Sequence, residues 1–150
     1  MKNLILKVFI IFVVSACGYS PLMINKNINI EFREIITSGN NEISNKISNR
    51  MRYMVNEISE NKLMLNSTIN KTIASKNKKG NPEIFNIDLK INLQIFLDDK
   101  KFEDKIFNES VSYNNLSSKF ELKEREKKIK DSLTDKITND ILLYLQSIQK

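Results

Sequence analysis

The chain has 150 residues, a formal net charge of +6 at pH 7, 41% hydrophobic and 28% charged residues, proportions typical of one globular domain. It contains no histidine and a single cysteine, so the commonest general base is absent and an intramolecular disulfide or a cysteine metal cluster is excluded. We therefore expect a protein that is not an enzyme and that uses no metal or other cofactor.

The N-terminal residues have the pattern of a secretory signal. Lys2 and Lys7 bracket the start of an apolar sequence whose uninterrupted part, residues 8–14, is shorter than the ~20 residues of a membrane-spanning helix. It ends in Val14-Ser15-Ala16-Cys17, the order of a bacterial lipobox. We expect residues 1–16 to be a lipoprotein signal peptide and the Cys17 thiol to carry lipid. The alternative is a transmembrane anchor with an incidental cysteine.

The residues after Cys17 predict the location of the protein. Several acyl chains on Cys17 would hold it firmly in a membrane. The next residue is Gly18, whereas aspartate at this position retains enterobacterial lipoproteins in the inner membrane. We therefore expect a lipid-anchored protein on the periplasmic face of the outer membrane, with residues 17–26 as a tether and residues 27–150 as the folded domain.

The first part of the domain predicts a strand followed by a helix. Ile28, Ile30 and Phe32 alternate with polar residues, which indicates a strand. Residues 38–41, Ser-Gly-Asn-Asn, predict a turn. Apolar residues then recur at helical spacing and predict a helix over residues 42–60, with these positions on its buried face: Ile43, Ile47, Met51, Met54 and Ile58.

Three further strands are expected next. Leu63, Leu65, Ile69 and Ile73 share one parity and predict the second strand, and residues 77–82 have the composition of a hairpin connection. Between residues 85 and 97 every second residue is apolar, which predicts a long antiparallel strand with one buried face. A turn at residues 98–101 and a fourth strand over residues 102–114 follow.

The last element is a predicted helix. Ser118 and Glu121 have the spacing of a capping box, and apolar residues recur at helical spacing from residue 129 to residue 148. The expected order is β-α-β-β-β-α. The predicted fold class is α+β, a two-layer domain with an antiparallel-rich four-stranded sheet and two helices packed on one face.

The sequence offers few candidates for a functional site. The glycines at 18, 39 and 80 form no phosphate-binding loop, and Asp98 and Asp99 lie in a predicted turn rather than in an acid–base pair. Lys76, Lys78 and Lys79, with Lys71 nearby, gather toward the tip of the hairpin that joins the second and third strands. We interpret them as a docking point for the phosphates of an anionic glycolipid or for an acidic lumen wall. The alternative is a loop that reflects the abundance of lysine in this chain. No nucleic-acid partner is expected.

Four motifs, in order, resemble the LPS-assembly lipoprotein (LptE) family, particularly its alphaproteobacterial members. They are the opening Cys17-Gly18-Tyr19-Ser20-Pro21-Leu22, the helical Asn49-Arg50, the Ser112-Tyr113-Asn114 motif, and the aliphatic run from Ile137 to Leu145. The resemblance covers nearly all of the chain after residue 16.

This resemblance implies a structural role rather than a catalytic one. Family members are plugs in the lumen of the outer-membrane β-barrel LptD, where they support barrel assembly and the insertion of lipopolysaccharide (LPS) into the outer leaflet. Only the lipidation of Cys17 is carried over by motif, and the assignment of Lys76, Lys78 and Lys79 to LPS or barrel contact is our own hypothesis. The alternative function is a barrel-independent outer-membrane lipoprotein that binds a soluble ligand or peptidoglycan.

Overall fold

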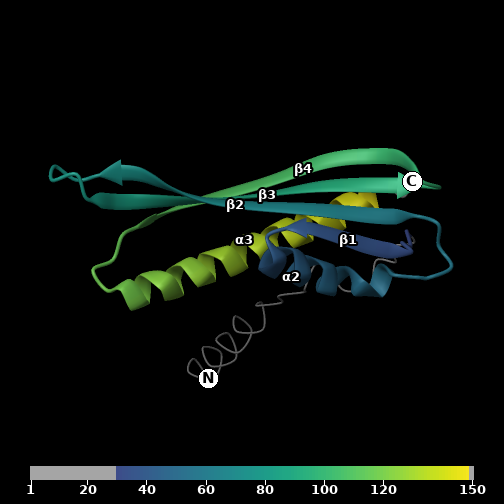
Figure 1. The fold of residues 1–150 in the computed structure, drawn as a ribbon, viewed down its shortest axis with the longest axis horizontal. Helices are drawn as coiled ribbons and strands as arrows, with labels where there is room; N and C mark the ends of the chain where they lie inside the picture. Colours follow the sequence, from purple (N-terminus) through teal and green to yellow (C-terminus); the bar gives the residue numbers. More distant parts are fainter. Residues whose placement is uncertain (1–29, 149–150) are drawn as a thin grey trace, which may run out of the picture.

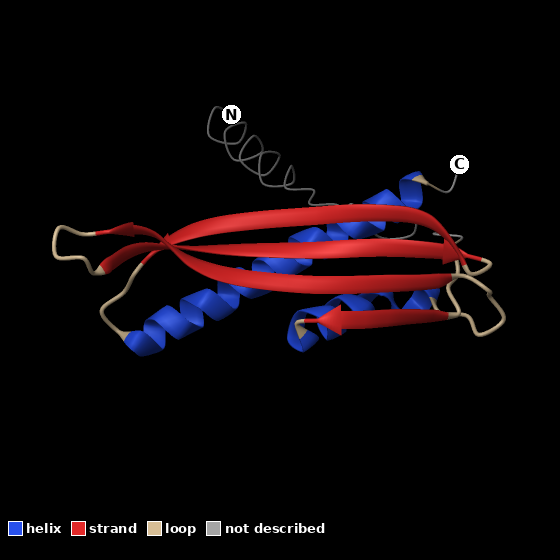
Figure 2. Ribbon diagram, turned by 45° about the horizontal axis from the view of Figure 1, so that its top comes forward, coloured by secondary structure: helices blue, strands red, loops and turns tan. Residues whose placement is uncertain are grey.

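The fold is a two-layer α+β arrangement, as the sequence predicts. A computed structural model describes residues 30–148, so Cys17, Ile28 and the predicted signal peptide lie outside the described residues. Both helices cover the same face of a four-stranded sheet (Figures 1 and 2). The elements are β1 (Glu34–Gly39), α2 (Asn41–Met51), the 3-10 turn η1 (Arg52–Met54), β2 (Lys62–Lys76), β3 (Pro82–Leu97), β4 (Lys100–Asn114) and α3 (Lys119–Ser147).

The sheet has the order β1-β2-β3-β4. β1 pairs with β2 in parallel, and the other two pairs are antiparallel. The alternation predicted for the third strand is confirmed, because its odd-numbered residues face the helices and five of them are fully buried: Ile87, Leu89, Ile91, Leu93 and Ile95. Burying an isoleucine or leucine side chain stabilises the fold by roughly 1.5–3 kcal/mol, so this row forms the centre of the core.

Helix α3 covers the sheet along most of its length. The Ser118 hydroxyl accepts a hydrogen bond from the Glu121 amide at 3.3 Å, which confirms the predicted N-terminal cap. The residues that α3 turns toward the sheet are spaced four apart and are buried: Leu133, Ile137, Ile141 and Leu145. Neither α2 nor α3 combines the length and the apolar character needed to cross a membrane.

The first strand is displaced from its predicted position. β1 begins at Glu34, and Phe32 instead forms an isolated parallel bridge with Val55. The Phe32 amide donates to the Met54 carbonyl at 2.9 Å, and the Asn56 amide donates to the Phe32 carbonyl at 2.8 Å. This bridge holds the Phe32 ring inside the core, where it is fully buried. Alternation in the sequence located the inward-facing phenylalanine and missed the strand that follows it.

The helix predicted over residues 42–60 ends early, at Met51. One 3-10 turn follows, and Met54 is still buried, but the Ile58 side chain is 90% exposed and does not belong to the helical face. The reason is the bridge to Phe32, because it takes backbone groups of Met54 and Asn56 that a continuing helix would use internally.

Residues 38–41 form a corner between strand and helix. Gly39 belongs to β1 and has a φ of +85°, and a Cβ at this position would lie 2.0 Å from the Ser67 carbonyl oxygen. Only glycine allows this approach of β1 to β2. Asn40 then caps α2, because its side-chain oxygen accepts a hydrogen bond from the Ile43 amide at 3.1 Å. The hydroxyls of Ser44 and Ser67, 2.6 Å apart, join helix and sheet beneath the corner.

Both predicted hairpins are present. The β3–β4 turn contains only Asp98 and Asp99, with φ values of +49° and +58°, so β4 begins at Lys100 rather than at residue 102. Two consecutive residues with positive φ are typical of the tight turns that join twisted antiparallel strands. The longer β2–β3 connection, residues 77–81, extends from the opposite end of the sheet.

Candidate functional site

The β2–β3 hairpin extends beyond the rest of the sheet and beyond α3 (Figure 1). Its turn is held by Asn77, whose side-chain oxygen accepts hydrogen bonds from the amides of Lys79 at 2.9 Å and Asn81 at 3.0 Å. The Gly80 amide donates to the Asn77 carbonyl at 2.9 Å, and Gly80 has a φ of +82°. The tip is therefore a defined turn rather than a loose loop.

The three lysines singled out in the sequence lie together at this tip. Lys76 ends β2, Lys78 and Lys79 lie in the turn, and all three side chains are exposed. Among residues 30–148, none of the three takes part in an ion pair. Three solvated ammonium groups on a fixed turn can bind phosphate or carboxylate groups. Their role as ligand-binding residues stays a prediction.

Lys71, which the sequence analysis grouped with these lysines, has a different role. Its ammonium lies 2.5 Å from Glu126 of α3 and 4.1 Å from the centre of the Phe85 ring. The Tyr113 hydroxyl donates to the same Glu126 oxygen at 2.8 Å. We call Lys71, Tyr113 and Glu126 the polar latch, because together they fasten the N-terminal half of α3 to the sheet.

Within the polar latch, the Glu126 carboxylate is stabilised in its ionised form by its two partners. Burial raises the pKa of Glu126, but hydrogen bonds from Lys71 and Tyr113 outweigh it and hold that pKa below its usual range. Burial and the neighbouring carboxylate raise the pKa of the Tyr113 hydroxyl. The pair therefore consists of an ionised carboxylate and a neutral phenol at pH 7. The sequence analysis missed this contact, although Tyr113 is the middle residue of the Ser-Tyr-Asn motif.

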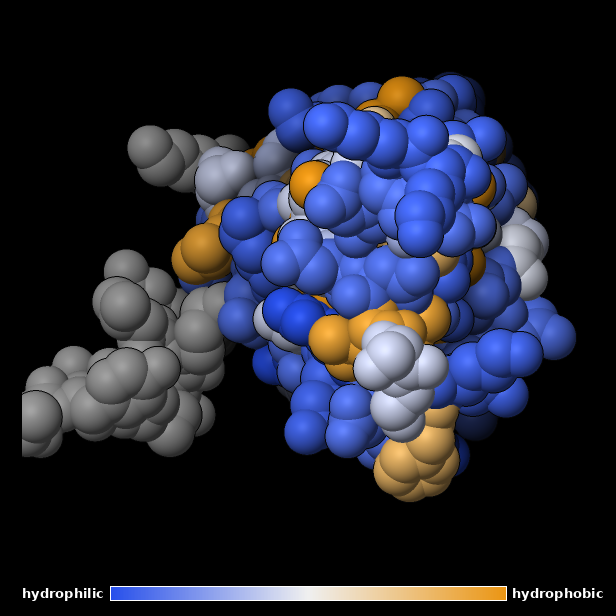
Figure 3. Space-filling model, turned by 90° about the vertical axis from the view of Figure 1, so that its left-hand side faces the viewer, coloured by the Kyte–Doolittle hydropathy of each residue, from blue (hydrophilic) through white to orange (hydrophobic). Residues whose placement is uncertain are grey.

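Apolar side chains accompany the lysines at the same end of the molecule. Ile73 of β2, Val111 of β4 and Phe120 in the first turn of α3 are all exposed. Figure 3 looks onto this end and shows apolar patches set among hydrophilic side chains. We call the surface formed by the β2–β3 tip and these three residues the hairpin end. It combines exposed cations with exposed apolar groups, as a phosphorylated and acylated ligand requires.

The face of the sheet that points away from the helices is a second candidate surface. Within residues 30–148 no helix or strand covers it (Figure 2). Its central residues are mostly uncharged and polar, and Asn86 accepts hydrogen bonds from Ser110 at 3.1 Å and Ser112 at 3.0 Å. We call it the outer face, and its uncharged polar residues are Asn66, Thr68, Asn70, Thr72, Asn86, Asn92, Gln94, Asn108, Ser110, Ser112 and Asn114.

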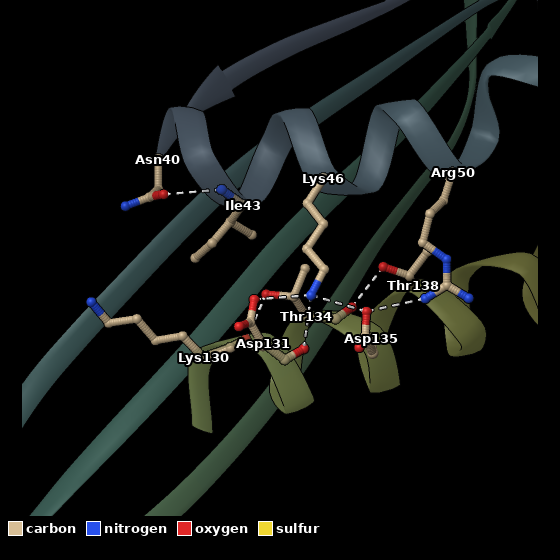
Figure 4. Close-up of polar contacts among 9 residues, drawn as sticks. All are labelled: Asn40, Ile43, Lys46, Arg50, Lys130, Asp131, Thr134, Asp135 and Thr138. Atoms are coloured by element: carbon tan, nitrogen blue, oxygen red, sulfur yellow. Dashed lines mark hydrogen bonds and ion pairs between the residues drawn. The ribbon is translucent and has the colours of Figure 1, made fainter. Parts of the chain in front are cut away.

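Charged residues also cluster between the two helices (Figure 4). Lys46 of α2 lies 3.0 Å from Asp131 and 3.2 Å from Asp135 of α3, and Arg50 pairs with Asp135 at 3.2 Å. Burial lowers the pKa of Lys46, but the two carboxylates outweigh it and raise that pKa. Arg50, from the Asn49-Arg50 motif of the sequence analysis, also donates a hydrogen bond to the Asn139 side chain at 3.0 Å. This cluster joins α2 to α3 and so has a structural role.

The remaining candidates are Asp98 and Asp99, which form the β3–β4 turn. Asp99 pairs with Lys62 across the sheet end at 2.6 Å, which is a surface ion pair. No group of three or more potential metal ligands occurs among the described residues.

Comparisons with known proteins give the fold. No family model and no curated protein matches the sequence. The fold is similar to that of rare lipoprotein B from Shewanella oneidensis, with a TM-score of 0.58 at 16% identity over 77% of this chain and 95% of that one. Lipoprotein B from Nitrosomonas europaea has a TM-score of 0.58 at 13% identity, over 82% of this chain and 88% of that one. A minor lipoprotein from Acinetobacter baumannii has a TM-score of 0.56 at 11% identity, over 79% of this chain and 95% of that one. The chain therefore has a fold found in bacterial lipoproteins.

Proposed function

We propose that this protein is an acylated outer-membrane lipoprotein that serves as plug and assembly subunit of the LPS translocon. In this role the domain lies in the lumen of the barrel LptD, and Cys17 carries the membrane anchor. The lipobox, the motifs that resemble the LptE family and the fold shared with bacterial lipoproteins support the proposal. The role is structural and requires neither catalysis nor a cofactor.

The observation that carries this proposal is the outer face. A protein that fills a barrel contacts a polar wall, because the interior of a membrane barrel is hydrophilic. Charged groups are costly to bury in such a contact, whereas amides and hydroxyls exchange water for protein partners at little cost. The outer face provides amides and hydroxyls along β2, β3 and β4. Its two central charges, Asp88 and Lys90, have opposite signs, and Lys62, Lys101 and Asp104 lie near the β3–β4 end.

Co-purification with mutants of the outer face tests the proposal. The acylated protein with a C-terminal tag is purified from detergent-solubilised outer membranes, and a large barrel is expected at one-to-one stoichiometry. Thr72→Glu adds a charge to the outer face of β2 opposite the uncharged Asn86 and should abolish recovery of the barrel. Ser132→Glu adds the same charge to an exposed position of α3 and is the control. Recovery of the unmodified lipoprotein alone, folded and monomeric, would contradict the proposal.

We further infer that the hairpin end contacts LPS. Lys76, Lys78 and Lys79 supply cations for its phosphates, and Ile73 and Phe120 supply apolar surface for its acyl chains. Changing the three lysines to glutamate should weaken LPS binding, and the remaining affinity should lose its salt dependence. The control changes three exposed lysines of α3, Lys123, Lys127 and Lys128, in the same way. Equal LPS binding by the two triple variants would exclude the tip as the contact.

The alternative function is that of a barrel-independent lipoprotein that binds a soluble ligand or peptidoglycan. One observation favours it, a groove of about 620 Å³ at the end of the sheet opposite the hairpin. Its size is that of a small-molecule site. This function predicts a stable monomer whose unfolding temperature rises when the ligand is added, and whose recovery from membranes is independent of Thr72→Glu.

A further inference from the structure

The groove lies where β3 turns into β4, at the end of the sheet remote from the β2–β3 tip. We call it the anchor groove. It has a volume of about 620 Å³, and polar groups from Glu31 and the segment 56–61 form part of its rim. Six of its ten lining residues are apolar and come from parts of the chain that are far apart in sequence: Ile30, Ile58, Ile95, Leu97, Phe102 and Ile148.

Two walls of the anchor groove expose large apolar side chains. The pairing of β3 with β4 shifts register between Ile95, opposite Glu103, and Phe96, opposite Lys101, so Phe102 is the extra residue of a β-bulge. A bulge redirects the side chain that it adds, and here the ring lines the groove while 54% of its surface remains exposed. Ile58, on the segment between η1 and β2, is 90% exposed. Exposed apolar side chains of this size beside a concave surface are typical of a binding site.

The chain itself supplies an occupant. Ile30 lines the groove and is the first described residue, so residues 18–29 are attached at its rim. They contain a short apolar run, Pro21-Leu22-Met23-Ile24, and one basic residue, Lys26, which complements Glu31 on the rim. An extended chain covers about 3.5 Å per residue, so the run can reach every part of the groove. A covalently attached segment also has a high effective concentration at a neighbouring site.

We propose that the anchor groove binds residues 21–24 of the same chain. The apolar run covers the rings and side chains of Phe102, Leu97 and Ile58, and Lys26 lies near Glu31. The contact is independent of LPS and of any barrel, so it stands or falls separately from the function proposed above.

This docking would fix the orientation of the domain relative to the membrane. Pro21 is four residues after Cys17, a distance of at most about 14 Å when extended. An acyl chain on Cys17 would then hold the β3–β4 end close to the bilayer. The β2–β3 tip would lie away from it by the length of β3, which at 16 residues is about 50 Å. Docking of residues 21–24 would therefore give the domain a fixed orientation relative to the bilayer.

Photocrosslinking in the full chain tests the docking. Phe102 is replaced by p-benzoylphenylalanine, and crosslinked peptides are identified by mass spectrometry. Ile106 is the matched control, because it lies on the same strand with 53% of its surface exposed but faces away from the helices. We expect crosslinks from position 102 to residues 18–26 and none from position 106.

Two variants make the result decisive. Leu22→Asp with Met23→Asp should abolish the crosslink, because a carboxylate placed against Phe102, Leu97 and Ile58 loses its hydration without gaining a partner. Cys17→Ser should leave it unchanged, because the contact is made by side chains. Loss of the crosslink in Cys17→Ser would assign the groove to an acyl chain and overturn the proposal. Crosslinks from position 102 to a different protein, or equal crosslinks from positions 102 and 106, would also overturn it.

Discussion

The two ends of the sheet are built differently. At the end that begins with β1, the helix-facing residues of β2 are fully buried beneath α2 and α3, as at Leu63 and Leu65. Toward the β2–β3 tip the same row continues with Lys71 and with Ile73, which is 47% exposed. There β1 has ended, and a polar latch rather than an apolar core holds α3. One end supplies the stability of the domain, and the other is free to carry a binding surface.

Two glycines give the sharpest test of this contrast. Gly39 and Gly80 have nearly equal φ values, but a Cβ on Gly39 meets the Ser67 carbonyl at 2.0 Å, whereas a Cβ on Gly80 meets nothing within 4 Å. Gly39→Ala should lower the free energy of unfolding by about 3–5 kcal/mol, from backbone strain and steric overlap together. Gly80→Ala should lower it by about 1–2 kcal/mol. Urea denaturation measures both, and equal losses would contradict the contrast.

A pair of core substitutions extends the test to side chains. Ile91→Ala removes a fully buried side chain beneath α3 and should cost about 2–5 kcal/mol of unfolding free energy. Ile73→Ala makes the same chemical change at the hairpin end and should cost about 1 kcal/mol, because about half of the side chain is already in water. If the two losses in urea denaturation were similar, the hairpin end would share the core.

Removing one hydroxyl from the polar latch should loosen α3 locally. Tyr113→Phe deletes the hydrogen bond to Glu126, and we expect a loss of about 1 kcal/mol with faster amide exchange in residues 119–128. Tyr53→Phe is the control, since that ring is largely exposed on η1. Unchanged exchange in Tyr113→Phe would show that α3 is held there by apolar contacts alone.

Acidification should also loosen the N-terminal part of α3, by less than Tyr113→Phe does. Because the pKa of Glu126 is lowered in the folded protein, its contribution to stability is present above its unfolded value of about 4.3. That contribution is lost as pH falls through the lower folded pKa. Glu126→Gln should therefore exchange faster than the unmodified protein in residues 119–128 at pH 7, and the difference should shrink on acidification below pH ~4. A difference that grows on acidification would refute the assignment.

The ion pairs between α2 and α3 should contribute least to the free energy of unfolding. Lys46, Asp131 and Asp135 are partly exposed, and exposed pairs contribute about 0.2–1 kcal/mol. A double-mutant cycle with Lys46→Met and Asp131→Asn should give a coupling in that range that decreases with added salt. A coupling well above that range would make this cluster a main support of the helix layer.

Sequence patterns predicted the elements whose residues face one uniform environment. β3 and α3 each present one side to the core along their length, so periods of two and of about 3.6 residues are preserved in the sequence. β1 and the end of α2 were misplaced because the backbone bridge between Phe32 and Val55 decides both, and backbone pairing leaves no side-chain pattern.

The candidate sites divide in the same way. The lysines of the β2–β3 tip were predictable because a turn and its charges are adjacent in sequence. The ion pair between Lys71 and Glu126 was not predictable, because 55 residues separate the two side chains in sequence. The anchor groove combines a bulge at Phe102 with residues from both ends of the domain, and the bulge follows from strand register rather than from residue type. Long-range geometry therefore accounts for most of what the sequence missed.

The position of β1 at the edge of the sheet has a consequence for the order of folding. β1 and α2 are synthesised first, but β1 pairs with β2 and α2 packs against α3, which is synthesised after every strand. β2, β3 and β4 are joined by short turns, so they can pair as soon as they emerge. The core then closes only when α3 covers the row on β3. A chain interrupted before Lys119 would leave that row in water and prone to aggregate.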